Sequence, residues 1–190
     1  MRKFIFGVVV GVLGVAVGAY VYIHYGYLNM QADLPVVSME QFYLRGAMDR
    51  YAERYAPRVA SPVQPSDENL IAGIRLYKAN CVVCHGGSDK PISLVGNGLY
   101  PRAPQFLRHV PDLPQNQNFW IIKHGVARTG MPAWDKVMSD TEIWQVTAFL
   151  ARMEDFFKLS TPVQQAWKDG GQAEAGTQVP AQQAKPAGQR

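Results

Sequence analysis

The chain of 190 residues contains only two cysteines, so it lacks the thiols for a disulfide scaffold or for a zinc site with four cysteine ligands. Charged residues make up only 18% of the chain, while apolar residues make up 47%. That composition excludes a chain that is disordered throughout, and it allows a buried core. The length is enough for one domain of ordinary size together with accessory segments.

A concentrated basic surface is also missing, although the net charge is +4. Residues 1–23 carry +2, residues 24–65 carry four charges of each sign, residues 66–160 carry ten basic and nine acidic residues, and residues 161–190 carry +1. Binding to nucleic acid requires clustered cations that neutralise phosphates. The sequence therefore predicts no nucleic-acid partner.

The first segment has the properties of a membrane-spanning helix. Arg2 and Lys3 precede a stretch from Phe4 to Ile23 that contains no charged residue. Twenty helical residues span roughly 30 Å, the thickness of the hydrocarbon layer. A cleaved signal peptide is the alternative, but its apolar region runs about 7–15 residues, and apolarity here continues through Ile23. We therefore expect an uncleaved transmembrane anchor over residues 1–25, with Arg2 and Lys3 on the cytoplasmic side.

Four glycines recur at spacings of 4, 3 and 4 within this segment, so that they share one side of a helix. They are Gly7, Gly11, Gly14 and Gly18. Such a strip lets a second helix approach closely and predicts a transmembrane partner helix. The alternative is that glycine is simply frequent in membrane helices.

Two further segments lie outside the central region. Residues 26–65 are expected to be a linker with one helix, which begins at a capping-box pattern of Ser38 and Gln41 and ends before Pro57. The aromatic stripe of this helix is expected to pack against the following domain or a partner; it comprises Phe42, Tyr43, Tyr51 and Tyr55. Residues 161–190 are rich in Gln, Ala, Gly and Pro and are expected to be a disordered tail.

The chemistry is expected in residues 66–160, where both cysteines lie in the motif Cys81-Val82-Val83-Cys84-His85. The spacing C-x-x-C-H is the attachment signature of c-type haem. Two thiols at this spacing add to the two vinyl groups of a porphyrin, and the histidine that follows reaches the iron. A thioredoxin-like pair would need a βαβ context, and a zinc site would need four ligands. The motif therefore predicts one covalently bound haem c, with Cys81 and Cys84 as attachment points and His85 as an axial ligand.

A second axial ligand is expected from the other half of this region. Met131 lies in the run Thr129-Gly130-Met131-Pro132-Ala133-Trp134, where glycine allows close approach of the backbone and proline stiffens the loop. His124 is the chief rival ligand, with His109 behind it. An open sixth position on the iron is the third possibility.

Residues of about 66–158 resemble the class I c-type cytochromes, in particular bacterial membrane-anchored monohaem cytochromes c. Beyond the haem motif, the resemblance rests on Gly73 and Tyr77 before it, on Phe149 in the last helix, and on the segment from Ile121 to Trp134. It implies that the helices of Gly73 and Phe149 cross with the glycine at the contact. It also implies a loop proline whose carbonyl accepts the Nδ1 proton of the axial histidine, and Pro101 is favoured over Pro104.

The local pattern agrees with an all-α, cytochrome c-like haem domain preceded by one N-terminal transmembrane helix. Ser66 or Asp67 can cap a helix that runs to the haem motif. Ser139 and Glu142 form a capping box for the last helix. One face of that helix is expected to carry Ile143, Val146, Leu150, Met153 and Phe157. No stretch shows the sustained two-residue alternation of a strand.

The resemblance implies an electron-transfer protein and not an enzyme in its own right. It would be single-pass in the bacterial inner (cytoplasmic) membrane, with the haem domain in the periplasm. It would exchange electrons with redox protein partners, as a carrier or as the electron-entry subunit of a respiratory or dehydrogenase complex. The alternative is an open-site haem enzyme or gas sensor, in which Met131 is not a permanent ligand. A haemless assembly protein is the third reading.

Overall fold

The structure, a computed structural model, describes residues 1–27, 30–33 and 38–169. Throughout these residues the chain forms helices and no strand, which confirms the all-α expectation. The chain divides into two compact units, Met1–Leu34 and Pro35–Arg190.

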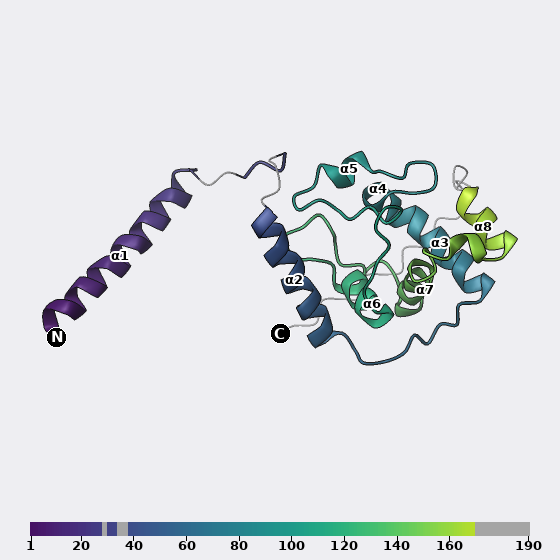
Figure 1. The fold of residues 1–190 in the computed structure, drawn as a ribbon, viewed down its shortest axis with the longest axis horizontal. Coiled ribbons are helices and arrows are strands. Elements are labelled where there is room, and N and C mark those ends of the chain that lie inside the picture. Colours follow the sequence, from purple (N-terminus) through teal and green to yellow (C-terminus); the bar gives the residue numbers. More distant parts are fainter. Residues whose placement is uncertain (28–29, 34–37, 170–190) are drawn as a thin grey trace. The chain divides into compact units, whose positions relative to one another are not determined.

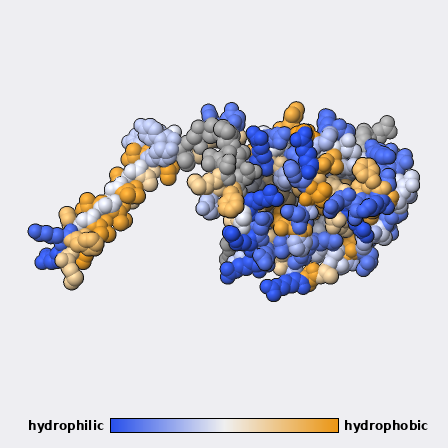
Figure 2. Space-filling view, in the orientation of Figure 1, coloured by the Kyte–Doolittle hydropathy of each residue, from blue (hydrophilic) through white to orange (hydrophobic). Residues whose placement is uncertain are grey.

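The first unit consists of helix α1, Arg2–His24 (Figure 1). No residue of α1 is buried, and its surface is apolar along most of its length (Figure 2). It is the one described helix that is long and apolar enough to cross a membrane, with a mean hydropathy of 2.4, although a signal sequence passes the same test. In the described chain, no heavy atom lies within 4 Å of a Cβ built on the four glycines of the strip. The partner helix therefore stays a prediction.

Two crossing helices form the centre of the second unit: α3, Asp67–Asn80, and α7, Asp140–Leu150. A Cβ added to Gly73 would lie only 2.2 Å from the backbone oxygen of Gln145, so the two backbones touch at this glycine. The rings of Tyr77 and Phe149 lie 5.5 Å apart, edge to face at 67°. The contact expected from the resemblance is therefore present. The core around it also contains Leu70, Ile74, Ile143 and Val146.

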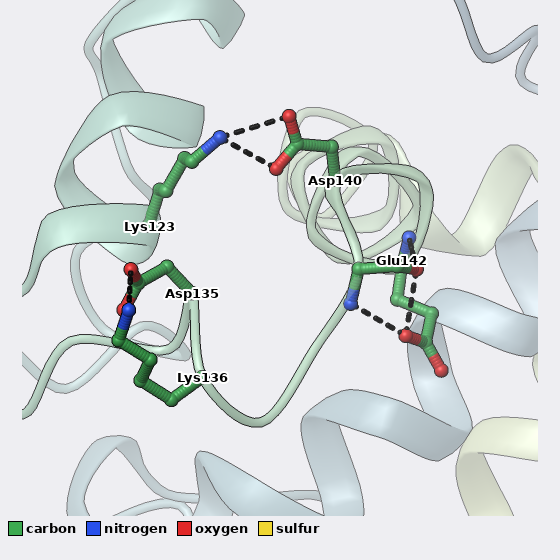
Figure 3. A network of polar contacts seen from close by, with 6 residues as sticks. Lys123, Asp135, Lys136, Asp140 and Glu142 are labelled. Atoms are coloured by element: carbon green, nitrogen blue, oxygen red, sulfur yellow. Dashed lines mark hydrogen bonds and ion pairs between the residues drawn. The ribbon is translucent and has the colours of Figure 1, made fainter. Parts of the chain in front are cut away.

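Helix α6, Gln115–His124, packs against α7. Near the end of α6, the Lys123 ammonium donates to both carboxylate oxygens of Asp140, at 2.6 and 2.8 Å (Figure 3). The Ser139 side chain accepts from the Glu142 backbone N–H, and the Glu142 carboxylate accepts from the Ser139 backbone N–H. The predicted capping box of this helix is therefore confirmed.

Helix α2, Ser38–Tyr55, packs against α6. Ala52 is fully buried, and Ala56 beyond the helix end is 6% exposed. The predicted packing of the aromatic stripe on the domain is wrong, because its four rings are between 50% and 74% exposed, and its packing on a partner stays a prediction. An alanine contributes little to the apolar pattern of a helix, although its small side chain lets another helix approach closely. The large aromatic residues of α2 therefore led the prediction to the exposed face of this helix and not to the face of Ala52. The side chains of Ser38 and Gln41 lie outside the described part of the chain, and their capping box stays a prediction.

The predicted disordered tail over residues 161–190 is wrong for its first part. Helix α8 spans Thr161–Lys168 and packs against α3. Val163 is fully buried and Trp167 is 6% exposed. Two large apolar residues four positions apart can order a short helix when an existing core receives them, because their burial offsets the lost chain entropy. Residues 170–190 lie outside the described residues.

The last predicted helix also ends earlier than its pattern indicated. Helix α7 stops at Leu150, and a 3₁₀ turn, Phe156–Lys158, precedes α8. Phe156 is 8% exposed, whereas Phe157 is 86% exposed. Because the chain forms turns after Leu150, the helical spacing of α7 no longer applies there, and Phe156 is buried in place of Phe157.

The contact at Gly73 yields a stability prediction. Gly73→Ala places a methyl group against the α7 backbone, and overpacking of this kind costs about 1–3 kcal/mol, more than the gain of about 1 kcal/mol in helix propensity. We expect a lower free energy of unfolding in denaturant titration of the full-length protein.

The matched control is Gly46→Ala in α2, where a Cβ would meet only the end of the Arg50 side chain at 3.8 Å. This variant should be equal to or slightly more stable than the wild type. Equal effects at the two glycines would contradict the close crossing.

Candidate functional site

The haem motif forms a short helix, α4, Val82–His85, which directly follows α3. The carbonyl of Cys81 accepts hydrogen bonds from the backbone N–H groups of Cys84, at 3.1 Å, and His85, at 2.9 Å. Cys81, Cys84 and His85 therefore stand at positions i, i+3 and i+4 of one helical turn, on the same side. One turn presents two thiols and an imidazole together.

Both cysteines are free thiols and half-buried. Burial raises the pKa of the Cys81 thiol to about 12, and the charge of Cys84 adds to this in the same direction. Cys81 is therefore protonated at neutral pH. Among the described residues, no group of three or more His, Cys, Asp and Glu side chains is placed to hold a metal ion, so the geometry does not favour a zinc site.

His85 is buried, with 8% exposure, and its Nδ1 lies 2.9 Å from the carbonyl oxygen of Pro104. A carbonyl only accepts, so Nδ1 carries the proton and Nε2 keeps the lone pair. Burial lowers the pKa of His85, and the hydrogen bond to Pro104 partly opposes this shift. The ring is therefore neutral at neutral pH, which is the form of imidazole that binds a metal through Nε2.

The preference for Pro101 as the residue whose carbonyl accepts the Nδ1 proton is wrong, since the carbonyl of Pro104 accepts it. Phe106 explains the difference. Its backbone N–H donates to the carbonyl of His85 at 3.2 Å, and its ring stacks on the imidazole at 4.3 Å and 5°. These contacts bring the backbone two residues before Phe106, which is Pro104, to the imidazole edge.

Helix α5, Leu94–Asn97, lies beside α4 (Figure 1). Its N-cap residue Ser93 donates from Oγ to the carbonyl of Val83 at 2.5 Å. A Cβ on Gly96 would lie 1.9 Å from the carbonyl oxygen of Cys84, so only glycine allows this approach. The backbone of the haem motif is therefore held against the segment that contains α5.

Met131 lies in a loop whose backbone is fixed on both sides. Its N–H donates to Thr129 Oγ1 and its carbonyl accepts from the Val126 N–H, both at 3.1 Å. The Met131 side chain is half-buried and packs against the core. A Cβ on Gly130 would lie 2.7 Å from the Leu99 side chain. Because Leu99 follows α5, the methionine loop packs on the same segment that holds the haem motif.

The two rival histidines lie in different surroundings. His124 is exposed at the end of α6, where its ring lies 3.9 Å from that of Trp120. His109 is exposed as well. These positions favour Met131 as the second ligand, and the ligand pair remains a proposal.

The residues present fit a covalently attached haem. Two free thiols lie on one helical turn, and the buried imidazole that follows them keeps a lone pair on Nε2. The thioether of Met131 lies in a loop whose backbone is held by hydrogen bonds to Thr129 and Val126. Three residues that hold this arrangement were missed from the sequence, namely Ser93, Gln105 and Phe106. Their polar and stacking contacts produce no repeating pattern in the sequence. The sequence offered one indication, which is that Gln105 and Phe106 directly follow Pro104.

Comparison with known proteins gives the same assignment. Residues 68–150 match the family described as cytochrome C oxidase, cbb3-type, subunit III. The matched region covers α3, the haem motif, the Met131 loop and α7. The residues before and after it, which include α1, α2 and α8, lie outside the match.

One curated relative is the quinohemoprotein alcohol dehydrogenase ADH IIB of Pseudomonas putida. It is 30% identical over 98 residues, which make up 51% of this chain and 13% of that protein. The chain therefore matches only a small part of the dehydrogenase. From its fold, its haem motif and the matched family, the region of residues 68–150 is a class I c-type cytochrome domain.

Proposed function

We propose that this chain is a membrane-anchored monohaem c-type cytochrome that transfers electrons on the periplasmic side of a bacterial inner membrane. It acts as a carrier or as the electron-entry subunit of a respiratory or dehydrogenase complex. Electron transfer as such follows from the cytochrome c domain. The observation that carries the proposal is the buried His85 ring, whose Nδ1 is bound to Pro104 while Nε2 stays available beside two free thiols.

When bound, haem c supplies an iron that alternates between the ferric and ferrous states. Cys81 and Cys84 would hold the group through two thioethers, and His85 Nε2 and the Met131 sulfur would bind its iron. With both residues bound, the iron would have no free position for a substrate, and the chain would transfer electrons without catalysing a reaction of its own. A neutral thioether ligand favours the ferrous state and raises the reduction potential relative to two imidazoles.

Redox protein partners are supported by the names of the matched proteins, which are an oxidase subunit and a haem-containing dehydrogenase. In the described chain the α1 helix is exposed along its whole length and apolar. As an anchor it would confine the haem domain to a shell at the membrane and raise its effective concentration near membrane complexes. The basic residues Arg2 and Lys3 support a cytoplasmic N-terminus.

Removal of one attachment thiol tests the haem assignment. Cys84→Ala, expressed with the c-type maturation machinery, should retain at most one thioether and lose most of its covalently bound haem. The pyridine haemochrome assay on denatured protein measures this, and the wild type should give about one haem per chain.

The matched control is Val83→Ala in the same turn, since Val83 is 59% exposed and should tolerate the change with full haem content. Full covalent haem in Cys84→Ala contradicts the assignment. A wild type without haem would instead support a haemless assembly protein.

The proposed second axial ligand is tested by replacing Met131 with leucine and, as a control, by making the same replacement at Met138. Met131→Leu should abolish the far-red absorption band that a methionine sulfur gives to ferric haem, and it should raise the affinity of the ferrous form for CO by at least about tenfold, because the sixth position opens. Met138→Leu changes a core residue that is 5% exposed and should alter neither property. A wild type that lacks the band and binds CO tightly would favour an open-site haem enzyme or gas sensor.

Anchoring is tested on the full chain in bacterial membranes. We expect the protein to remain in the membrane pellet after alkaline extraction, because a helix of this length and hydropathy is released only by detergent. The intact mass of the purified protein should include the residues of α1. A product that starts after α1 and is released by the alkaline wash shows that this segment is a signal peptide.

A further inference from the structure

A buried amide lies next to the proline that binds the axial histidine. Gln105 is 8% exposed. Its Oε1 accepts from the backbone N–H of Ser93 at 2.7 Å, and its Nε2 donates to the carbonyls of Cys84 and Ala103, each at 2.9 Å. The amide oxygen and both amide hydrogens are therefore used inside the protein.

Only one orientation of this amide fits its surroundings. Exchange of its oxygen and nitrogen would set the oxygen against two carbonyls and the NH₂ group against the N–H of Ser93. A buried polar atom left without a partner has given up its hydrogen bonds to water without a replacement, so the exchanged orientation is strongly unfavourable. The surroundings offer two accepting carbonyls and one donating N–H, and a glutamine amide can pair with all three. An ionised glutamate has no hydrogen to donate to the carbonyls.

The haem motif is bound through three consecutive backbone carbonyls, those of Val83, Cys84 and His85. Their donors are Ser93 Oγ, Gln105 Nε2 and the Phe106 N–H. Gln105 supplies the central bond of the three. The segment from Ser93 to Phe106 is thus attached to the motif along its whole turn, and loss of the amide would leave the carbonyl of Cys84 unpaired on this side.

Pro104 itself has no N–H with which to hold its own position. Its carbonyl reaches His85 only if the residues on either side are held. Ala103 is held through its carbonyl by the Gln105 amide, and Gln105 is held by its bond to the haem motif. The hydrogen bonds of the Gln105 side chain therefore fix the residues on both sides of Pro104, which are Ala103 and Gln105 itself.

We propose that Gln105 is a positioning residue for the axial imidazole: its amide keeps the Pro104 carbonyl in line with His85 Nδ1 and so sets the donor strength of Nε2 toward iron. This inference rests on the proposed role of His85 as the axial ligand. A hydrogen bond at Nδ1 makes the imidazole a stronger donor, and a stronger donor stabilises ferric over ferrous iron. A loosened Pro104 carbonyl therefore raises the reduction potential.

The test substitutes Gln105→Met in the full, haem-loaded chain, because methionine keeps the length of the side chain and removes all three hydrogen bonds. The readouts are the exchange rate of the His85 Nδ1 proton with solvent, followed by NMR in the ferrous protein, and the reduction potential. We expect exchange to be faster by roughly tenfold, because lost hydrogen bonds around the Pro104 carbonyl make local opening easier, together with a higher potential.

The matched control is Gln145→Met, which removes the bond from Gln145 Nε2 to Asn69 Oδ1 at the crossing of α3 and α7. It should lower thermal stability without changing Nδ1 exchange or the potential. Unchanged exchange in Gln105→Met overturns the proposal, and so does the same change in both variants, which would reflect general loosening.

A measurement on the wild type covers the case in which Gln105→Met does not fold. In native-state exchange at increasing denaturant, the protons on Gln105 Nε2, Phe106 N and His85 Nδ1 should exchange through one common opening. Separate openings for the Gln105 and His85 protons overturn the proposal. A wild type without covalent haem, or with a ligand other than His85, instead shows that the proposed function fails.

Discussion

The hydrogen bond from His85 Nδ1 to the Pro104 carbonyl governs the arrangement of the haem site. A buried imidazole needs a partner, because burial of an unpaired polar nitrogen is costly. The partner in this structure, the Pro104 carbonyl, also fixes the tautomer of His85, because a carbonyl at Nδ1 leaves the lone pair on Nε2. For the carbonyl to arrive there, the segment from Ser93 to Phe106 must be attached to the haem motif. The contacts of Gly96 and Gln105 on the Cys84 carbonyl provide that attachment.

The crossing of α3 and α7 supplies the rigid base for this site. Helix α3 leads directly into the turn of Cys81, so the position of the thiols is set by where α3 lies on α7. At Gly73 the two backbones meet without an intervening side chain, and the rings of Tyr77 and Phe149 fill the space beside them. Tyr77 also donates to the carbonyl of Gly86, just after the motif, at 2.9 Å. The core and the haem motif are thus joined at both ends of the turn.

Sequence reasoning succeeded where the deciding contacts are local. The capping box of Ser139 and Glu142 spans three residues, and its two hydrogen bonds need nothing else from the fold. The same holds for the Ser66 cap of α3. It failed where a side chain is buried by a distant segment. The rings of α2 are exposed, whereas Ala52 is fully buried in this helix, which packs against α6. Helix α8 is ordered because Trp167 packs into the core around α3 and α7.

By itself, the sequence determined the helical class of the fold and the three side chains that share one turn at the haem motif. The spacing of Cys81, Cys84 and His85 places them on one side of a single turn in any helical context, and apolar periodicity repeats within each helix. Only the tertiary structure decided that Pro104 binds the histidine and that Gln105 braces it. Both depend on contacts between segments about twenty residues apart, which involve single buried polar atoms and therefore produce no repeating pattern along the chain.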